Sequence, residues 1–360
     1  MSGTAGPPTH PAVDVVLGGT VFCDLVFSGL ALPERGTEVF AQDFVVSAGG
    51  TANRAVATAR LGMHTGLLAV LGADLFGDHL HRQLAAEPGL DLRWVRRDAR
   101  TRTAVTVAVT DRHDRSFITY EEAGTDVPDT WSGPLPAARA CHVGVARSIP
   151  SWVVDLRAAG TTVFGGVGWD PTGAWSPAVL DGLAGVDVLV LNDVEAMGYT
   201  RAPDVATAAE VLAERVPTVV VTRGPAGALA IGAATGARVD QPAPEVTVLD
   251  PTGAGDVFTG ALITATVLGW DLETAIRFAV LAGSLSVQSL GGALSAPRPC
   301  DIVAALRHAA PPGDWTTVLD WAESSGSSPP STDRPSSTHR RSGTGADDAP
   351  VRPTDTEETP

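Results

Sequence analysis

Short apolar segments alternate with helical patterns along most of the chain, and this alternation constrains the fold more than any other feature. Residues 13–17, 186–191 and 218–222 are apolar runs with the length of buried strands. Helical patterns lie at 55–61, 203–214, 257–268 and 272–288. Strands and helices that alternate at this spacing predict an α/β fold, with a mostly parallel sheet covered by helices on both faces.

Two segments do not fit this alternation. Residues 27–46 are short, alternating runs interrupted by Pro33 and Gly36, and residues 104–110 and 116–120 flank a polar turn. We predict that the segments at about 27–46 and 104–120 form a small β lid outside the main sheet.

The composition changes sharply near the end of the chain. Of the 37 residues from 324 to 360, 23 are Ser, Thr, Pro or Gly. Such a segment cannot bury enough apolar surface to offset the entropy lost on ordering. We therefore predict one domain over residues 12–323, a flexible N-terminus at 1–11 and a disordered tail at 324–360.

The basic residues exclude several classes of enzyme. All 25 of them are arginines, so the chain lacks the lysine that P-loop proteins, pyridoxal enzymes and protein kinases require. The formal net charge of −16 also argues against nonspecific nucleic-acid binding. An anionic nucleotide would have to be bound through backbone amides, an arginine or a metal ion.

Nothing in the sequence indicates a membrane segment or a secretion signal. The apolar runs are too short to span a bilayer, and the first residues lack a basic region followed by an apolar one. Cys23, Cys141 and Cys300 are too widely separated for a disulfide framework or a paired metal motif. We expect a cytoplasmic protein.

Residues 250–258 (DPTGAGDVF) are the strongest candidate for a site of chemistry. Gly253, Ala254 and Gly255 leave the backbone open to a ligand, and the first amides of a helix lack internal partners. Asp256 beside such an anion hole could accept a proton while the amides hold the developing charge. An ordinary capped helix start explains the same pattern, and the residues alone leave both interpretations open.

A second candidate segment is residues 47–55 (SAGGTANRA). Gly49 and Gly50 lead into an Ala-rich helix that has Asn53 at its entry. A tight turn with Asn53 as the helix cap is the alternative interpretation.

Together these segments resemble a known family. Residues 250–263 resemble the second signature of the PfkB, or ribokinase-like, carbohydrate kinases. An earlier segment resembles the first signature of the same family through Gly49, Gly50, Asn53, Ala55, Gly62 and Gly72. The resemblance covers roughly residues 12–310 and implies a ribokinase-like three-layer α/β sandwich with a small β lid. The loop between the glycines and Asn53 is one residue shorter than in ribokinases, so the resemblance does not name the sugar.

The resemblance implies an ATP-dependent kinase that transfers the γ-phosphoryl group to a primary hydroxyl of a sugar or a sugar-like substrate. Asp256 would be the base, and the amides of Gly253, Ala254 and Gly255 would hold the phosphoryl charge. The same resemblance assigns the sugar-binding residues, which would be Asp24, Gly49, Gly50 and Asn53.

The resemblance also implies nucleotide and metal positions. The nucleotide would be bound by Asn192, Thr222, Arg223, Gly224, Gly227 and Val280. Glu195 would hold Mg²⁺ through water, since Mg²⁺ keeps several waters when it is bound. A monovalent cation such as K⁺ would lie near Asp250, Thr252, Ser286, Ser289, Gly291 and Ser295. Without the resemblance, Asn192 would be a helix cap and Arg223 a solvated side chain.

Two other functions stay open. A nucleoside kinase of the same superfamily would need an apolar pocket for the base, which Phe27, Phe40 and Phe117 could supply. A non-catalytic sugar-sensing module would need neither Asp256 nor the anion hole. Residues 168–171 with Trp175 resemble a segment of several non-ribose members of the family. A homodimer is also left open.

Overall fold

The computed structural model describes residues 13–30, 32–110, 115–131, 133–145 and 148–325. The N-terminus expected to be flexible lies outside these residues, as does nearly all of the expected disordered tail. The exceptions are Ser324 and Ser325, which are the last two residues of a helix.

The main sheet has the strand order β14-β13-β12-β11-β10-β9-β1-β4-β5, and β6 pairs with β4. Neighbouring strands are parallel, except that β13 is antiparallel to β12 and to β14. The mostly parallel sheet expected from the sequence is therefore confirmed. Its strands are β1 (Val15–Gly18), β4 (Thr65–Gly72), β5 (Leu90–Asp91), β6 (Val95–Asp98), β9 (Ala140–Gly144), β10 (Thr162–Gly166), β11 (Val188–Asn192), β12 (Thr218–Thr222), β13 (Ala228–Gly232) and β14 (Ala237–Gln241).

Helices cover both faces of this sheet. Alternate residues of a strand point to opposite faces, so Val15 and Leu17 of β1 belong to one apolar core and Val16 to the other. The first core is closed by α1 (Thr51–Arg60), α2 (Leu75–Ala85), α6 (Ala254–Val267), α7 (Leu272–Ser286), α8 (Pro299–Ala309) and α9 (Thr316–Ser325). The second core is closed by α3 (Ser151–Ala158), η1 (Pro177–Leu183), α4 (Asp193–Thr200) and α5 (Val205–Ala213). Two further short helices are η2 (Gly224–Ala226) and η3 (Gly292–Ser295).

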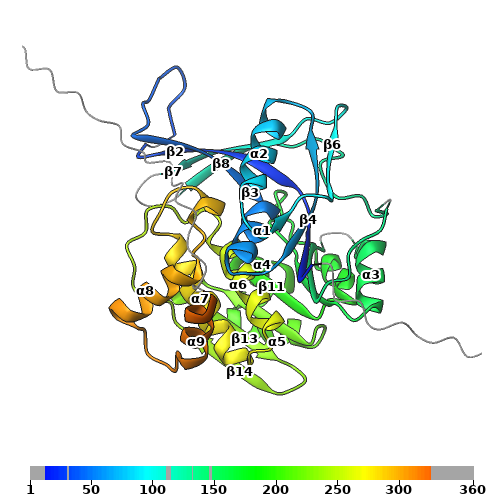
Figure 1. The fold of residues 1–360 in the computed structure, drawn as a ribbon, viewed down its shortest axis with the longest axis vertical. Coiled ribbons are helices and arrows are strands. Elements are labelled where there is room, and N and C mark those ends of the chain that lie inside the picture. Colours follow the sequence, from blue (N-terminus) through cyan, green and yellow to red (C-terminus); the bar gives the residue numbers. More distant parts are fainter. Residues whose placement is uncertain (1–12, 31, 111–114, 132, 146–147, 326–360) are drawn as a thin grey trace, which may run out of the picture. The chain divides into compact units, whose positions relative to one another are not determined.

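A small second sheet lies at one end of the molecule, away from β13 and β14 (Figure 1). Its strand order is β3-β2-β7-β8, from β2 (Val21–Ser28), β3 (Asp43–Gly50), β7 (Ala104–Thr110) and β8 (Arg115–Tyr120). The small sheet is confirmed, but its first part differs from the expected bounds. Strand β2 begins before residue 27, and residues 32–42 form no strand, because Pro33 and Gly36 interrupt the extended run.

None of the helices in the described part of the chain combines the length and the apolar character that a bilayer crossing requires. The three cysteines are free thiols, with Cys23 and Cys141 buried and Cys300 exposed.

The sheet reverses its winding at β1. The chain passes from β1 to β4 on one side, and then returns through β9, β10, β11 and β12 on the other. Ligands of open α/β sheets bind in the crevice at the carboxyl ends of the strands where such a reversal occurs. The topology alone therefore points to the ends of β1 and β9.

Helices α1 and α6 pack very closely over this crevice. A Cβ atom added at Gly260 of α6 would lie 2.9 Å from Cβ of Ala57 and 3.1 Å from the carbonyl oxygen of Arg54. Real Cβ atoms are almost never so close to a neighbour, so only glycine permits this distance between the two helices.

We predict that Gly260→Ala destabilises the fold. Overpacking costs about 1–3 kcal/mol, which exceeds the roughly 1 kcal/mol that alanine gains over glycine in a helix. Denaturant unfolding should therefore show a lower midpoint with an unchanged slope. Gly144→Ala is the control, because its added methyl group would meet no atom within 4 Å. Equal stability of Gly260→Ala and the wild type would show that the helices have room to separate.

Candidate active site

A cavity of about 1250 Å³ opens at the carboxyl ends of the central strands. Gly18, Gly144, Gly166 and Asn192 line it from the ends of β1, β9, β10 and β11. Further lining residues come from the small sheet and from the start of α6. Pockets for one small molecule are usually about 300–1,000 Å³, so this cavity has room for two substrates.

The segment before α6 is the one expected to form an anion hole. Gly253 precedes the helix with φ of 75°, and a Cβ atom there would lie 3.1 Å from Nδ2 of Asn53. Gly253, Gly255 and Asp256 line the cavity. The amide of Ala254 donates to the carbonyl of Pro251 at 3.3 Å, so this amide already has a partner.

Asp256 is held by two side chains of α1. Nδ2 of Asn53 donates to Oδ2 of Asp256 at 3.0 Å, and Arg54 forms an ion pair with Oδ1. The sequence analysis predicted a role for Asp256 and for Asn53, but it missed Arg54. The signal was available, because Arg54 directly follows Asn53 near the start of an Ala-rich helix, in a chain without lysine.

The Arg54 guanidinium retains donor capacity. Its Nη2 is 3.4 Å from Oγ1 of Thr51, and its Nε is buried without a hydrogen-bond partner. His142 of β9 also lines the cavity and is buried. Burial and the Arg54 charge hold the pKa of His142 well below its ordinary value, so this imidazole is neutral. The signal for His142 in the sequence was that it is the one charged or strongly polar residue in the apolar strand at 140–144.

Asp24 lies on β2 and is almost completely buried. A Cβ atom at Gly49 would lie 1.9 Å from Oδ2 of Asp24, so glycine is required where β3 passes this carboxyl group. Burial, and then the charges of Asp256 and Asp250, raise the pKa of Asp24 to about 7. Gly50 lines the cavity, whereas Asp24, Gly49 and Asn53 are not among its lining residues.

The end of β11 carries a reciprocal cap. Oδ1 of Asn192 accepts the amide of Glu195 at 2.8 Å, and Oε2 of Glu195 accepts the amide of Asn192 at 3.1 Å. Both residues line the cavity, as does Thr222 at the end of β12. Burial raises the pKa of Glu195. Asn192 is therefore the N-cap of α4 and also a wall of the cavity.

The other expected nucleotide residues do not line this cavity. Arg223 forms an ion pair with Asp240 of β14 and donates to the carbonyl of Ala226 at 3.0 Å. Gly227 has φ of 83°, and a Cβ atom there would lie 1.9 Å from the carbonyl oxygen of Gln241. Val280 is buried in α7, and Gly224 begins η2.

Asp250 joins the two segments expected to surround a monovalent cation. Its carboxylate accepts the amides of Thr252 at 2.9 Å and Gly291 at 3.0 Å. The hydroxyl oxygen of Thr252 is buried without a partner. The side chains of two of the expected serines are less available to a cation. The hydroxyl of Ser286 donates to the carbonyl of Gly283, and the hydroxyl of Ser295 donates to the carbonyl of Gly292. The amide of Ser289 donates to the carbonyl of Ser286 at 3.4 Å.

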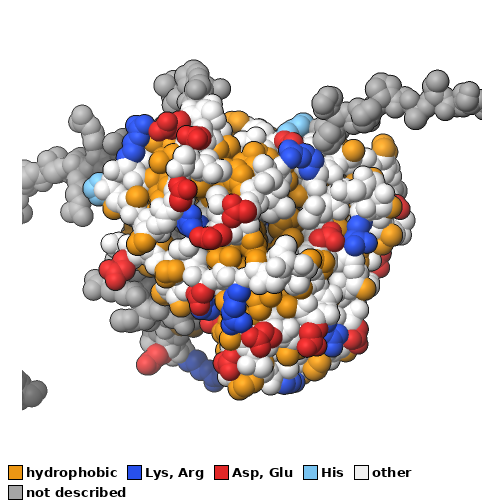
Figure 2. All heavy atoms as spheres, turned by 90° about the horizontal axis from the view of Figure 1, so that it is seen from below, with side chains coloured by type: hydrophobic (Ala, Val, Ile, Leu, Met, Phe, Trp, Pro, Cys, Tyr) orange, Lys and Arg blue, Asp and Glu red, His pale blue; other side chains and the backbone are white. Residues whose placement is uncertain are grey.

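The cavity is acidic. Oγ1 of Thr20 lies 3.1 Å from Oε1 of Glu121 and 2.8 Å from Oδ1 of Asp126. Asp129, Glu195 and Asp256 also line the wall, and Arg54 is the cation among the described lining residues. Acidic side chains with arginines between them are also visible on the face shown in Figure 2. An anionic ligand would therefore need helix dipoles, Arg54 or a metal ion.

Comparisons with known proteins identify the family of this chain. The family model "pfkB family carbohydrate kinase" matches residues 15–299. The ribokinase of Mus musculus is 27% identical in an alignment of 326 positions that covers 84% of this chain and 98% of that protein.

Two solved structures share the fold. Arabidopsis thaliana ribokinase, complexed with ribose and ATP, has a TM-score of 0.68 and 25% identity, covering 82% of this chain and 99% of that one. The aminoimidazole riboside kinase of Salmonella enterica, complexed with aminoimidazole riboside and an ATP analogue, has a TM-score of 0.66 and 26% identity, covering 81% and 100%.

The expected ribokinase-like fold is thus confirmed, and the matched region contains both glycine-rich segments and Asp256. This chain belongs to the pfkB family of carbohydrate kinases and is a phosphotransferase that acts on an alcohol group.

Proposed function

We propose that the protein transfers the γ-phosphoryl group of ATP to a primary hydroxyl of a sugar or of a sugar-containing substrate. The observation that carries this proposal is Asp256, which lies in the cavity wall directly after the Gly253–Gly255 segment and is fixed by Asn53 and Arg54. The ribokinase of Arabidopsis thaliana, which binds ribose and ATP, supports it.

In this proposal Asp256 accepts the proton of the acceptor hydroxyl. Each oxygen of its carboxylate has one donor from α1, which leaves further lone pairs for that hydroxyl. The amides at the start of α6 hold the charge of the transferring phosphoryl group. Phosphoryl transfer depends mainly on positioning and electrostatic stabilisation, and the carboxylate of Asp256 beside the amides of Gly253 and Gly255 would supply both, whereas the amide of Ala254 is already bonded to Pro251.

Asp24, Gly49, Gly50 and Asn53 remain the residues proposed to bind the acceptor. Asp24 lies near enough to Asp256 for the two carboxylates to interact, because the charge of Asp256 contributes to the raised pKa of Asp24. A carboxylate can accept hydrogen bonds from two adjacent hydroxyl groups. The small sheet would cover the bound acceptor and exclude water, which competes as an acceptor.

Glu195 is the residue proposed to hold hydrated Mg²⁺. The site fits this ion, because Glu195 offers an oxygen ligand in the cavity wall beside Asn192. No three metal-ligating side chains converge within the described residues, so the phosphates of ATP would supply the remaining non-water ligands. Bound Mg²⁺ would neutralise the phosphate charge in a cavity whose wall is acidic.

We also propose a monovalent cation, such as K⁺, beside the loop at 250–252. The unpartnered hydroxyl oxygen of Thr252 is the observation that fits such a group. The Asp250 carboxylate accepts the amides of both Thr252 and Gly291, so it holds the residue that carries this hydroxyl near the backbone of Gly291. The nucleotide roles of Thr222, Arg223, Gly224, Gly227 and Val280, a homodimer and a cytoplasmic location stay predictions.

We predict that Asp256→Asn lowers kcat at least about a hundredfold and leaves the affinity for ATP within a few-fold. General-base catalysis typically contributes about 10²–10⁴. Steady-state kinetics with ATP and a panel of sugars, sugar acids and nucleosides measures this. Asp181→Asn, which changes an exposed ion pair, is the matched control. Wild-type turnover in a folded Asp256→Asn would remove Asp256 from the mechanism, whereas no turnover by the wild type on any member of the panel would favour a sensing module.

We predict that Arg54→Met lowers kcat by about ten- to a hundredfold, the equivalent of one hydrogen bond to a charged group. Without Arg54, the Asp256 carboxylate keeps only Asn53 as its partner and loses its fixed orientation. Arg54→Lys should restore part of the rate, because lysine keeps the charge but not the planar geometry. Arg238→Met removes an exposed ion pair and is the control. A purely structural Arg54 would give normal kcat at temperatures well below melting.

We predict that the KM for the acceptor falls as the pH rises from 6 to 8. With a pKa of about 7, Asp24 is mostly protonated at pH 6 and mostly ionised at pH 8. The ionised fraction rises roughly tenfold between these values, and the ionised form accepts hydrogen bonds at both oxygens. Asp24→Asn should abolish this dependence, and Asp24→Ala should raise the acceptor KM about ten- to a hundredfold without changing the ATP KM. A pH-independent acceptor KM in the wild type would contradict the assignment.

A further inference from the structure

We propose that Trp169 forms a stacking surface for a second ring of the acceptor. This inference rests on the proposed function and narrows it. The acceptor would then be larger than a free monosaccharide, with one sugar presenting the primary hydroxyl and an additional ring lying against the indole. That ring could be a planar heterocycle or the apolar face of a second sugar.

Trp169 occupies an unusual position. It lies in the loop after β10, it lines the same cavity as Asp256, and it is 64% exposed. Tryptophan is usually well buried because its large apolar surface is costly to leave in water. An exposed indole in the wall of a cavity is the arrangement that stacks on a ring of a ligand.

Other aromatic rings support Trp169 from behind. Trp175 meets Trp169 edge to face at 5.0 Å between centroids, and Tyr199 of α4 meets Trp175 in the same manner at 5.1 Å. Tyr199 is buried, and its hydroxyl donates to the carbonyl of Gly168 at 3.1 Å. Gly168 and the ring of Trp175 are therefore both held by contacts with Tyr199 of α4.

Asp170 gives the loop its shape. Its carboxylate accepts the amide and the hydroxyl of Thr172 at 2.9 and 2.7 Å, and the amide of Trp175 at 2.6 Å. These bonds close the loop between Trp169 and Trp175. A loop closed in this way orders its side chains before a ligand arrives, which reduces the entropy lost on binding.

The support contains backbone strain. Among the described residues, the non-glycine residues with positive φ are Trp175, at 48°, and Arg201, at 60°. Both belong to this support, because Arg201 donates to the carbonyl of Ala174. Gly198 of α4 permits the packing, since a Cβ atom there would lie 2.6 Å from the Trp175 ring. Strained conformations persist where surrounding contacts enforce them, and here the contacts of Trp175 with Tyr199 and Asp170 fix the ring behind Trp169.

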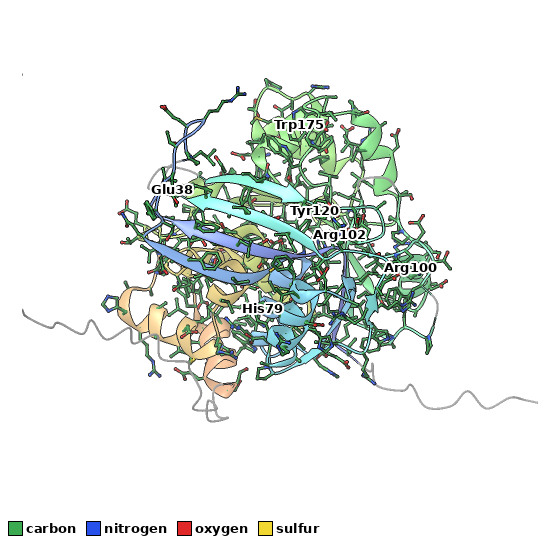
Figure 3. The ribbon with its side chains drawn as sticks, turned by 90° about the horizontal axis from the view of Figure 1, so that it is seen from above. Glu38, His79, Arg100, Arg102, Tyr120 and Trp175 are labelled. Atoms are coloured by element: carbon green, nitrogen blue, oxygen red, sulfur yellow. The ribbon has the colours of Figure 1, made fainter. Side chains whose placement is uncertain are left out.

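The location of Trp169 favours the acceptor over the adenine of ATP. Trp175 lies in the segment after β10, and Tyr120 lies on β8 of the small sheet (Figure 3). Several residues that follow β8, namely Glu121, Gly124 and those at 126–129, line the cavity together with Trp169. Gly224 and Val280, which are the residues expected on the side of the nucleotide base, do not line the cavity. Asn192, Glu195 and Thr222 line the cavity from the side expected for the phosphates, so the shared wall with the residues after β8 is what favours the acceptor for Trp169.

The first experiment compares acceptors with and without a second ring. The wild-type chain would be assayed with ATP and free ribose or fructose, with ribonucleosides, and with disaccharides. We expect kcat/KM at least tenfold higher for one of the two ring-bearing classes, and the class that wins identifies the ring. Equal or higher kcat/KM for the free sugars would overturn the proposal.

The second experiment tests Trp169 itself. Trp169→Ala should lower the ratio of kcat/KM for the ring-bearing acceptor to that for the free sugar by about five- to a hundredfold, the range of base stacking. Trp169→Phe should retain most of this ratio, because it retains an aromatic face. Leu75→Ala removes an exposed apolar side chain outside the cavity and is the control. A rise in the KM for ATP alone would overturn the proposal, because the indole would then stack on the nucleotide.

Two further measurements separate this inference from the proposed function. Quenching of tryptophan fluorescence by the ring-bearing ligand without ATP should be present in the wild type and much weaker in Trp169→Phe. Quenching without any turnover would refute the proposed kinase activity and support the stacking surface. Gly198→Ala, which displaces Trp175 without entering the cavity, should reduce the same ratio as Trp169→Ala. An unchanged ratio in folded Gly198→Ala would refute the role of the support.

Discussion

The close packing of α1 on α6 is the contact on which the candidate site depends. Gly260 faces Ala57 and the backbone of Arg54 at a distance that no larger residue permits. One helix turn toward the amino terminus of α6, the same packing brings Asn53 and Arg54 against Asp256. Asp256 and its two partners therefore belong to two rigid helices, and precision at the site follows from the packing of small residues rather than from a flexible loop.

A buried carboxylate fixes the loop that precedes α6. Asp250 accepts the amides of Thr252 and Gly291, so the loop at 250–252 and the turn at 291 share one anchor. Gly253 then turns into the helix in the left-handed region, against Asn53. Burial of Asp24, and then the charges of Asp256 and Asp250, raise the pKa of Asp24. The acidic side chains of the cavity wall can accept hydrogen bonds from the hydroxyl groups of a substrate. They repel phosphate groups, so the binding of phosphates requires a metal ion or Arg54.

Some elements were predictable because they depend on local sequence. The strands at 186–191 and 218–222 and the helices at 257–268 and 272–288 all correspond to observed elements, since apolar runs and helical periodicity report burial directly. The segment at 27–46 was predicted less well. Its second strand pairs with the first only because a loop returns the chain, and Pro33 and Gly36 mark that loop. Arg223 likewise looked free for a phosphate until β14 placed Asp240 beside it.

The sequence by itself determined the fold class, the glycine-rich segment before Asp256 and the position of Asp256 at the start of a helix. These features are encoded by neighbouring residues, through periodicity, chain flexibility and unpaired amides. Only the tertiary structure decided that Arg54 would contact Asp256 and that Trp169 would stand exposed on a strained support. Such contacts join residues far apart in the chain, and they depend on how closely helices and strands pack, which no local pattern records.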